Sequence, residues 1–302
     1  MVRSPFGFLP YLRTLHIEKL LGSGGMGVVW LTTERGSGRK VALKVMRHDL
    51  AEPEVARARF ETEIEAARRC AHHHVLDVLD DGETGGLRWF TMEYAARGSL
   101  RSCLRGLRMP LDLAVRFLER LARTVDFIHQ SSVVHRDLSL ENVLLTKERV
   151  FKVSDFGLAR FTDRMEGQGT MIYQPAGRLT YMAPEVGRGD LRRAGPATDI
   201  FALGVIMSEV LTGRPPFAVR RTSLEQVRNP PRVAPSRWRV DLPRGLDLIC
   251  LKCLSQDPHD RYEHAEALAD DLRRFRDGRP LQVQPWLTRL VQRARGLFRR
   301  QS

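Results

Sequence analysis

The sequence predicts an α+β protein of two lobes, a small antiparallel β-rich lobe that carries one helix and a larger, mainly helical lobe. Residues 14–46 alternate short apolar or β-branched runs with glycine-rich turns, which is typical of antiparallel strands joined by tight turns. Beyond Gly98, apolar residues recur at the spacing of helices. We therefore expect the small lobe over residues 14–95 and the large lobe over residues 96–276.

The elements of the small lobe follow in order along the chain. Strands are expected within LGSGGMGVVWLTTE and GSGRKVALKVM, and a later strand within LRWFTMEYA. Between them, the stretch from Pro53 to Cys70 is rich in Ala, Glu and Arg, which favours a helix. The predicted apolar face of that helix carries Val55, Phe60, Ile64 and Ala67.

In the large lobe, two helices have the clearest patterns. The first ends near His129, and one of its faces is marked by Leu113, Phe117, Leu121, Val125 and Ile128. The second runs from Ile200 to Leu211 and is apolar all round, so it should be buried. Short strands are expected in VVH, NVLLT and FKVSD, and the Pro- and Arg-rich segment 214–243 is predicted to form surface loops.

The composition of the 302 residues is basic, with 49 Lys and Arg against 36 Asp and Glu and a net charge of +13. This charge favours anionic partners but is too weak a signal to predict nucleic-acid binding. Cys250 and Cys253 lie in the apolar run LICLKCL, so buried, reduced thiols are favoured over a zinc site. With neither a secretory signal nor a long apolar run, a cytoplasmic location is expected.

A glycine-rich motif, Gly22-x-Gly24-x-x-Gly27-x-Val29, lies between two predicted strands. Glycines let a backbone turn approach phosphates and point its N–H groups at them. The position between two strands argues against a dinucleotide-binding unit, which needs a strand and a helix. Taken alone, the motif fits a ligand-free hairpin equally well.

A lysine and a glutamate at suitable spacing strengthen the phosphate interpretation. Lys44 ends the run VALK on the next predicted strand, and Glu63 follows nineteen residues later on the predicted helix. A lysine that binds phosphate oxygens needs a carboxylate to hold it in place. Glu61 and Glu65 are close rivals for that position.

Three further motifs follow: HRDLSLEN at residues 135–142, DFG at 155–157 and MAPE at 182–185. With these motifs in this order and spacing, residues 14–276 resemble the protein kinase family, and in particular the bacterial, eukaryotic-like serine/threonine protein kinases. The resemblance implies a bilobal protein-kinase-like fold with the active site in the cleft between the lobes. Residues 277–302 would form a tail outside the domain.

The resemblance also implies a role for each matching residue. Asp137 would accept or orient the proton of the substrate hydroxyl, and Asn142 and Asp155 would hold Mg²⁺, with Mn²⁺ as an alternative metal. Lys44 would bind the α- and β-phosphates of ATP, with Glu63 as its partner. Residues around the nucleotide would be Leu21, Gly22, Ser23, Gly24, Gly25, Met26, Gly27, Val29, Ala42, Met92, Glu93, Ala95 and Leu144.

Two supporting contacts are implied as well. Asp199, at the start of the buried helix, would brace the loop that carries Asp137. Arg261, in the run DPHDRY, would pair with Glu185.

The chain departs from the family pattern beside Asp137. Serine/threonine kinases usually carry a lysine two residues later, where this chain has Ser139, and tyrosine kinases often carry an arginine at the position of Glu141. The usual Gly-Thr after the activation loop is replaced by Gly177-Arg178. We hypothesise that Arg178 supplies the missing cation, because arginine suits phosphate.

Three possible functions follow from these motifs. The first is an ATP-dependent serine/threonine kinase acting on protein hydroxyls and phosphorylating its own activation loop. The second is a pseudokinase that binds nucleotide as a switch or scaffold, and a small-molecule phosphotransferase is the third. The candidate phosphorylation sites are Thr162, Thr170, Tyr173 and Thr180, and the phosphorylated residue would contact Arg136.

The last residues predict a basic amphipathic helix. One face carries Trp286, Leu287, Leu290, Val291, Ala294, Leu297 and Phe298, and the remainder carries Arg289, Arg293, Arg295, Arg299 and Arg300. Such a helix binds an acidic membrane surface or the groove of a partner protein, unless it packs on its own domain or is disordered.

Overall fold

The structure is a computed structural model, which describes residues 14–25, 27–47, 53–163, 178–190, 193–217, 223–229 and 232–283. The chain divides into two compact units. The first contains the described residues up to Ser99 together with Val143–Arg160, and the second contains Leu100–Asn142 and the described residues from Phe161 onward. The α+β architecture expected from the sequence is confirmed.

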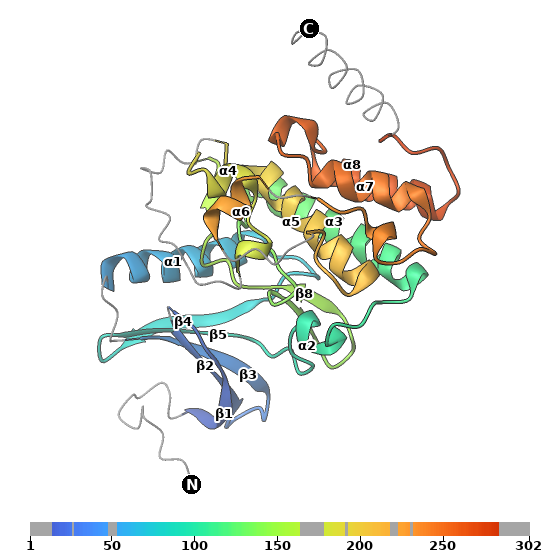
Figure 1. Cartoon of the computed structure of the whole chain (residues 1–302). Coiled ribbons are helices and arrows are strands. Elements are labelled where there is room, and N and C mark those ends of the chain that lie inside the picture. Colours follow the sequence, from blue (N-terminus) through green and yellow to red (C-terminus); the bar gives the residue numbers. More distant parts are fainter. Residues whose placement is uncertain are drawn as a thin grey trace, which may run out of the picture. The chain divides into compact units, whose positions relative to one another are not determined.

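The first unit is built on a five-stranded antiparallel sheet with the strand order β1-β2-β3-β5-β4 (Figure 1). Its strands are β1 (Leu15–Ser23), β2 (Gly27–Glu34), β3 (Lys40–Met46), β4 (Val78–Thr84) and β5 (Leu87–Glu93). One long helix, α1 (Pro53–Arg69), packs on this sheet, and β7 (Val143–Leu145) pairs with β8 (Phe151–Val153).

The central strand β3 has two different faces, because side chains alternate across a strand. Val41, Leu43 and Val45 are buried in one cluster together with Trp89 of β5. Lys44 is paired in register with Phe90 of β5, and Phe90 packs in a second cluster with residues of α1. The alternation therefore directs Lys44 toward the helix.

The second unit is mainly helical. Its helices are α2 (Leu100–Leu104), α3 (Leu111–Gln130), α4 (Pro184–Gly187), α5 (Pro196–Thr212), α6 (Leu224–Arg228), α7 (Arg244–Cys253) and α8 (Ala265–Arg276). Short 3₁₀ turns are η2 (Arg178–Thr180), η3 (Pro235–Arg237) and η4 (Pro258–Asp260), and the two-residue strands are β6 (Val133–Val134) and β9 (Arg160–Phe161). As predicted, α5 is buried along nearly its whole length, and α3 packs along α8 (Figure 1).

Not every residue on the predicted apolar faces is covered, since Leu113 is 54% exposed and Val55 is 38% exposed. One expectation about an individual segment was wrong. The segment 214–243 is not only loop, because α6 forms within it. The hydroxyl of Ser223 accepts a hydrogen bond from the N–H of Gln226 at the start of α6, and Val227 is fully buried.

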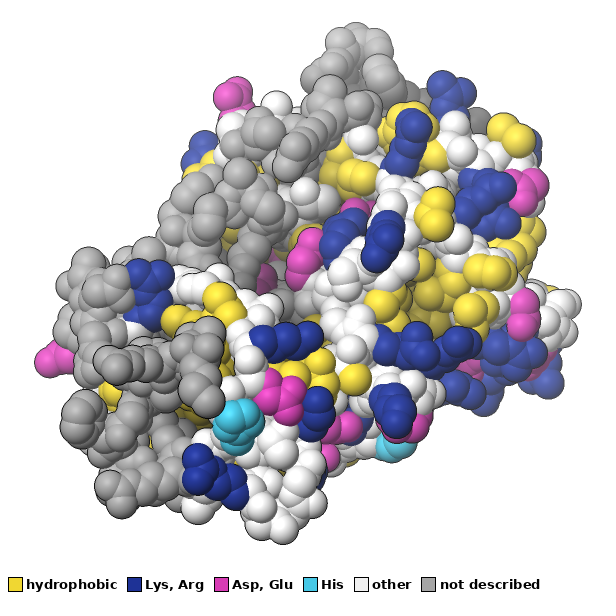
Figure 2. All heavy atoms as spheres, turned by 90° about the horizontal axis from the view of Figure 1, so that it is seen from below, with side chains coloured by type: hydrophobic (Ala, Val, Ile, Leu, Met, Phe, Trp, Pro, Cys, Tyr) yellow, Lys and Arg dark blue, Asp and Glu magenta, His cyan; other side chains and the backbone are white. Residues whose placement is uncertain are grey.

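Cys250 and Cys253 are buried in α7, as the apolar run around them predicted, and burial raises the pKa of the Cys253 thiol to about 12. Lys and Arg side chains are spread over the face shown in Figure 2. In the described part of the chain, no helix has the length and apolar character to cross a bilayer.

Candidate functional site

Lys44 is held between two carboxylates of the first unit. Its Nζ lies 2.6 Å from both side-chain oxygens of Glu63 and 3.9 Å from Oδ1 of Asp155. The side chains of Lys44 and Glu63 are only 12% and 6% exposed. Because water is largely excluded, this pair is a charge-assisted contact with a defined direction and differs from a surface ion pair.

The two rival glutamates of α1 have other partners. Glu61 pairs with Arg88 of β5 at 2.6 Å, and Glu65 lies 3.5 Å from Arg69 one turn further along the helix. The pair of Glu61 with Arg88 thus holds α1 to the sheet, and the pair of Glu65 with Arg69 lies within α1 itself. Of the three glutamates, Glu63 is the one that reaches Lys44.

Asp155 follows β8 with a left-handed backbone. Its φ is +64°, and Arg136, next to Asp137 in the second unit, has a φ of +65°. A non-glycine residue in this region carries a cost of about 1–3 kcal/mol, and such strain is concentrated at functional sites. Both residues lie in motifs that the sequence had singled out.

The glycine-rich hairpin between β1 and β2 has glycines of two kinds. A side chain at Gly27 would approach the carbonyl oxygen of Val45 to 2.8 Å, so the packing of β2 on β3 requires this glycine. At Gly24 the nearest atom of the described residues would lie 3.9 Å away, and at Gly22 there is none within 4 Å. These two positions therefore leave bare backbone that a phosphate can approach.

The other proposed nucleotide-binding residues also belong to the first unit. Ala42 pairs with Met92 across β3 and β5, and Gly22 pairs with Val29 across β1 and β2. Leu144 is bridged to Ser99. The remaining members are Leu21, which is 40% exposed, and Ser23, Gly25, Glu93 and Ala95. Met26 lies outside the described residues.

Glu93 is fixed by two contacts within this unit. Its N–H donates to the carbonyl of Asp77 at 3.0 Å, and its carboxylate pairs with Lys152 of β8 at 2.8 Å. The strand end where β5 passes into residues 94–99 is thereby held to the β7–β8 hairpin.

In the second unit, Asp137 and Asn142 are joined directly. The side-chain nitrogen of Asn142 donates to the backbone carbonyl of Asp137 at 2.8 Å and to its Oδ2 at 3.0 Å. The N–H of Asn142 donates to the hydroxyl and the carbonyl of Ser139 at 3.3 and 3.2 Å. Ser139 thus closes the turn that carries Asn142.

The residues that bear oxygen ligands suit a hard cation. Asn142 uses the nitrogen end of its amide on Asp137, and an amide oxygen or the carboxylate of Asp155 is the kind of ligand that Mg²⁺ prefers. Magnesium is usually held by one or two such groups together with substrate phosphates. Each of the two side chains, taken by itself, therefore fits a metal that is bound together with a nucleotide.

Asp199 braces the loop that contains Asp137, as predicted. Its two oxygens accept the N–H groups of His135 and Arg136 at 2.9 and 2.8 Å, and His129 Nε2 lies 2.8 Å away. Burial alone would raise the pKa of Asp199. The hydrogen bond and charge of His129, together with the N–H of Arg136, nevertheless hold this pKa below its usual range.

The predicted pair between Glu185 and Arg261 is also present. Arg261 donates two parallel hydrogen bonds to the carboxylate at 2.8 and 2.7 Å, and the two side chains are 0% and 1% exposed. The hydroxyl of Thr198 donates to the same carboxylate at 3.0 Å. The residue after Pro184 is therefore tied to the start of α5 and to the loop before α8.

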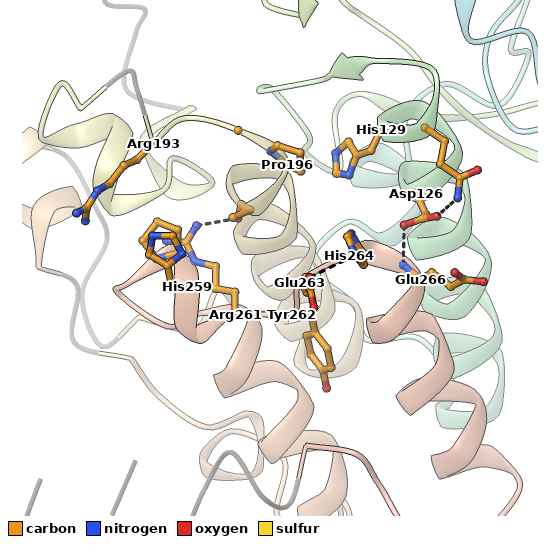
Figure 3. A pocket seen from close by; sticks show the side chains of 14 residues that line it. Asp126, His129, Arg193, Pro196, His259, Arg261, Tyr262, Glu263, His264 and Glu266 are labelled. Carbon is orange, nitrogen blue, oxygen red and sulfur yellow. Dashed lines mark hydrogen bonds and ion pairs between the residues drawn. The ribbon is translucent and has the colours of Figure 1, made fainter. Parts of the chain in front are cut away.

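A hollow of about 920 Å³ opens beside these supports (Figure 3). The end of α3, residues 193–197 and residues 258–266 line it, and its walls include His129 and Arg261. Among the described residues, neither Asp137 nor Asn142 lines this hollow. It borders the residues that support the loop and is not itself the candidate site.

Sequence reasoning missed two supporting side chains, His129 and Arg101. His129 contacts Asp199 across 70 residues, and Arg101 contacts Glu141 across 40 and Glu209 across 108 residues. Neither contact has a local sequence signal, since each residue looks like an ordinary member of a helix surface. Besides Met26, the predictions for Thr170, Tyr173, the side chain of Arg178 and the amphipathic helix of the C-terminal tail lie outside the described residues.

Comparisons with known proteins agree with this geometry. The family model described as "Protein kinase domain" matches residues 15–272. The chain is 32% identical to the serine/threonine-protein kinase PknB of Mycobacterium leprae over 90% of its length, and 31% identical to the serine/threonine-protein kinase PrkC of Bacillus subtilis over 85%. These matches cover 44% and 40% of the two relatives, so the chain spans less than half of their length.

Proposed function

Because this chain belongs to the protein kinase family, we propose that it transfers the γ-phosphoryl group of ATP to serine or threonine hydroxyls of proteins. The observation that carries the proposal is the buried contact of Lys44 with Glu63, with Asp155 at 3.9 Å. A lysine oriented in this way, next to a carboxylate suited to a metal, is the arrangement that phosphoryl transfer requires. The PknB and PrkC relatives are named serine/threonine kinases, which supports this acceptor class.

Different residues of the chain have different roles in the proposed reaction. Lys44 binds phosphate oxygens while Glu63 fixes its direction, and the absence of side chains at Gly22 and Gly24 lets phosphates approach the backbone closely. Asn142 and Asp155 would each offer an oxygen ligand to Mg²⁺ or Mn²⁺. Bound ATP would supply the phosphoryl group, and the metal would neutralise negative charge on its phosphates.

Asp137 handles the proton of the acceptor. Its Oδ2 receives a hydrogen bond from Asn142, which fixes the carboxylate in position. The carboxylate orients the acceptor hydroxyl and takes its proton. Asp199 holds the backbone of the same loop through His135 and Arg136.

The first test measures transfer directly. Purified chain is incubated with γ-labelled ATP, Mg²⁺ and a generic acceptor protein, beside the variant Asp137→Asn. We expect label in the acceptor from the wild type and a loss on the order of 10²-fold or more in the variant, since the group that handles the proton is removed. Equal labelling by both proteins would contradict the assignment of Asp137.

The second candidate function is a nucleotide-binding switch without phosphoryl transfer. Ser139 favours it, because this buried hydroxyl closes a turn at the position where a lysine would contact the phosphoryl group. The same labelling experiment separates the two functions. ATP binding without label in any acceptor, including the chain itself, would favour the switch.

We further propose that Arg178 supplies the cation which Ser139 does not. An arginine suits a phosphoryl group because its guanidinium offers several donors in a fixed plane. We expect Arg178→Ala to lower the transfer rate by about 10²- to 10³-fold, which is the usual loss when a donor to the transition state is removed. Steady-state rates of phosphoryl transfer by the wild type and Arg178→Ala measure this loss, and full activity of the variant would contradict the proposal.

Two finer parts of the proposal concern regulation and location. The chain phosphorylates its own activation loop, with Thr170 as the first candidate site and Tyr173 as the second. The C-terminal tail binds an acidic membrane surface, so the protein would be cytoplasmic and peripheral to a membrane. Mass spectrometry of the chain after incubation with ATP and Mg²⁺ tests the first statement.

A further inference from the structure

Arg101 of α2 joins three distant segments of the second unit. Its Nε lies 2.9 Å from Oε1 of Glu141, and its Nη2 lies 2.9 Å from Oε1 of Glu209 on α5. The same Nη2 donates to the hydroxyl of Tyr181. These four residues, Arg101, Glu141, Tyr181 and Glu209, are called the Arg101 cluster below.

Backbone contacts fix the cluster to the loop that carries Asn142. The N–H of Arg101 donates to the carbonyl of Leu140 at 3.0 Å, and the N–H of Leu140 donates to the hydroxyl of Tyr181 at 3.3 Å. Glu141 directly precedes Asn142 in the sequence. The cluster therefore holds both neighbouring positions before Asn142, one by its backbone and one by its carboxylate.

The side chains of the Arg101 cluster differ in burial, from the buried Glu209 to the exposed Glu141. The side chain of Glu209 is 5% exposed, that of Arg101 36% and that of Glu141 54%. Burial raises the pKa of Glu209, and the hydrogen bond from Tyr181 and the charge of Arg101 oppose this rise. The buried carboxylate and the hydroxyl thus fix the guanidinium, and the guanidinium in turn fixes the exposed Glu141.

Arginine is suited to this bridge for a chemical reason. Its planar guanidinium carries five donors in a fixed geometry, so it can bind one carboxylate through Nη2 and another through Nε at the same time. A lysine ammonium at the same place would lack this fixed plane. The contacts of Arg101 with Glu141 and Glu209 use two different nitrogens of this plane, Nε and Nη2.

We propose that Arg101 is a positioning residue, which acts through Glu141 to hold the loop that presents Asp137 and Asn142. The predicted effect of Arg101 on the rate rests on the proposed kinase function, whereas its predicted effect on the loop does not. It also gives Glu141 a task at a position where tyrosine kinases often carry an arginine. Through its contact with this carboxylate, Arg101 of α2 holds the loop.

The opposing possibility is an ion pair without consequence, because exposed pairs contribute little. The chain offers a matched example of such a pair. Arg116 and Asp112 on α3 lie 2.9 Å apart and are 53% and 70% exposed. Arg116→Ala therefore controls for the loss of one arginine and one ion pair.

The main experiment measures hydrogen exchange of the Leu140 and Asn142 amides in the full chain without nucleotide. Glu141→Gln removes the pair with Arg101 but leaves Glu209 with its cation, so the fold keeps its buried contact. We expect exchange of these amides to quicken by about 10-fold in Glu141→Gln and at least as much in Arg101→Ala, because the loop opens locally. Arg116→Ala should exchange like the wild type.

Kinetics of the same proteins provide the second measurement. We expect Arg101→Ala and Glu141→Gln to lower kcat by about 10- to 10²-fold through misplacement of the loop, with the KM for ATP within about 2-fold. The double variant should be no slower than Arg101→Ala, since both changes break one connection. Millimolar guanidinium chloride should restore part of the rate of Arg101→Ala, whereas sodium chloride at the same concentration should not.

Each outcome decides the proposal. Wild-type exchange of Leu140 and Asn142 in Glu141→Gln would overturn it, as would losses in kcat that multiply in the double variant. If Arg101→Ala exchanges faster throughout the second unit and guanidinium restores nothing, Arg101 is structural only and the proposal is wrong. A wild-type chain that transfers no phosphate would refute the kinase function, and the exchange rates would still decide the role of Arg101.

Discussion

Asp199 shows how much one buried side chain organises at the residue scale. Its carboxylate accepts hydrogen bonds from two consecutive backbone N–H groups, those of His135 and Arg136, and contacts His129. The backbone of Arg136 is left-handed, with a φ of +65°. A single carboxylate thus compensates for strain in the loop before Asp137.

Replacing Asp199 with asparagine should therefore destabilise the protein. The amide group can keep only one oxygen acceptor and directs its N–H₂ at one of the backbone N–H groups. We expect a loss of about 1–3 kcal/mol in the free energy of unfolding at pH 7, the usual cost of leaving a buried donor unsatisfied. Urea unfolding measures it, and Asp112→Asn, at the 70% exposed surface pair, is the control.

The pH dependence of this difference follows from the lowered pKa of Asp199. A carboxyl group whose pKa is lower in the folded state stabilises the fold above its unfolded pKa, and this contribution is lost as the pH falls through the folded value. The gap between wild type and Asp199→Asn should stay constant above the reference value of 3.8 and shrink below it. A gap that widens in acid would contradict the assignment.

At the scale of elements, α1 has to be held in place because it carries Glu63. Phe60 of α1 is fully buried and meets the ring of Phe90 edge-on, with 5.1 Å between the ring centres. Arg88 of β5 adds an ion pair to Glu61 on the same helix. An apolar contact and a charged one thus fix the helix on the sheet.

Phe60→Ala should test the apolar contact. We expect a loss of about 3–5 kcal/mol in the free energy of unfolding, because a large buried ring leaves a cavity. Val55→Ala on the same helix is the matched control, and its 38% exposure predicts a change within about 0.5 kcal/mol. Similar losses in both variants would show that α1 is held along its whole length and not mainly at Phe60.

The prediction of elements from sequence succeeded where the pattern is local. The apolar spacing of α3 marked one face, on which Phe117, Leu121, Val125 and Ile128 are buried while Leu113 is exposed. Periodicity identifies a face of a helix, yet only the partner decides how far along the helix that face is covered. The same reason explains the exposure of Val55 near the start of α1.

At the scale of the whole molecule, segments that follow one another in the sequence can belong to different compact units. Val143–Arg160 follows the Asp137 loop in sequence but belongs to the first unit, so Asp155 joins Lys44 there. The sequence motifs located both residues, because the family pattern is local. The Arg101 cluster and His129 could not be found in this way, since their contacts depend on how segments 40–108 residues apart fold together.

Net charge is a further property of the whole chain, and it leads to a prediction about membranes. At +13 the chain is attracted to any anionic surface, while the predicted tail helix combines arginines with apolar side chains. Each basic residue near an anionic bilayer contributes about 1 kcal/mol, and this attraction weakens with salt. We expect co-sedimentation with vesicles that contain about one third phosphatidylserine at low ionic strength, and none with neutral vesicles.

Two matched triple variants separate the tail from the total charge. Replacing Arg293, Arg295 and Arg299 by glutamine, or Arg57, Arg68 and Arg116 by glutamine, lowers the net charge equally, from +13 by three to +10. The second set is 50%, 50% and 53% exposed on the folded units, so its loss leaves the fold intact. If the tail binds the bilayer, the first variant loses about 10²-fold in partitioning, at about 1 kcal/mol per arginine, and the second loses much less. Equal losses would show that the charge of the whole molecule drives the attraction and that the tail is not the membrane-binding element.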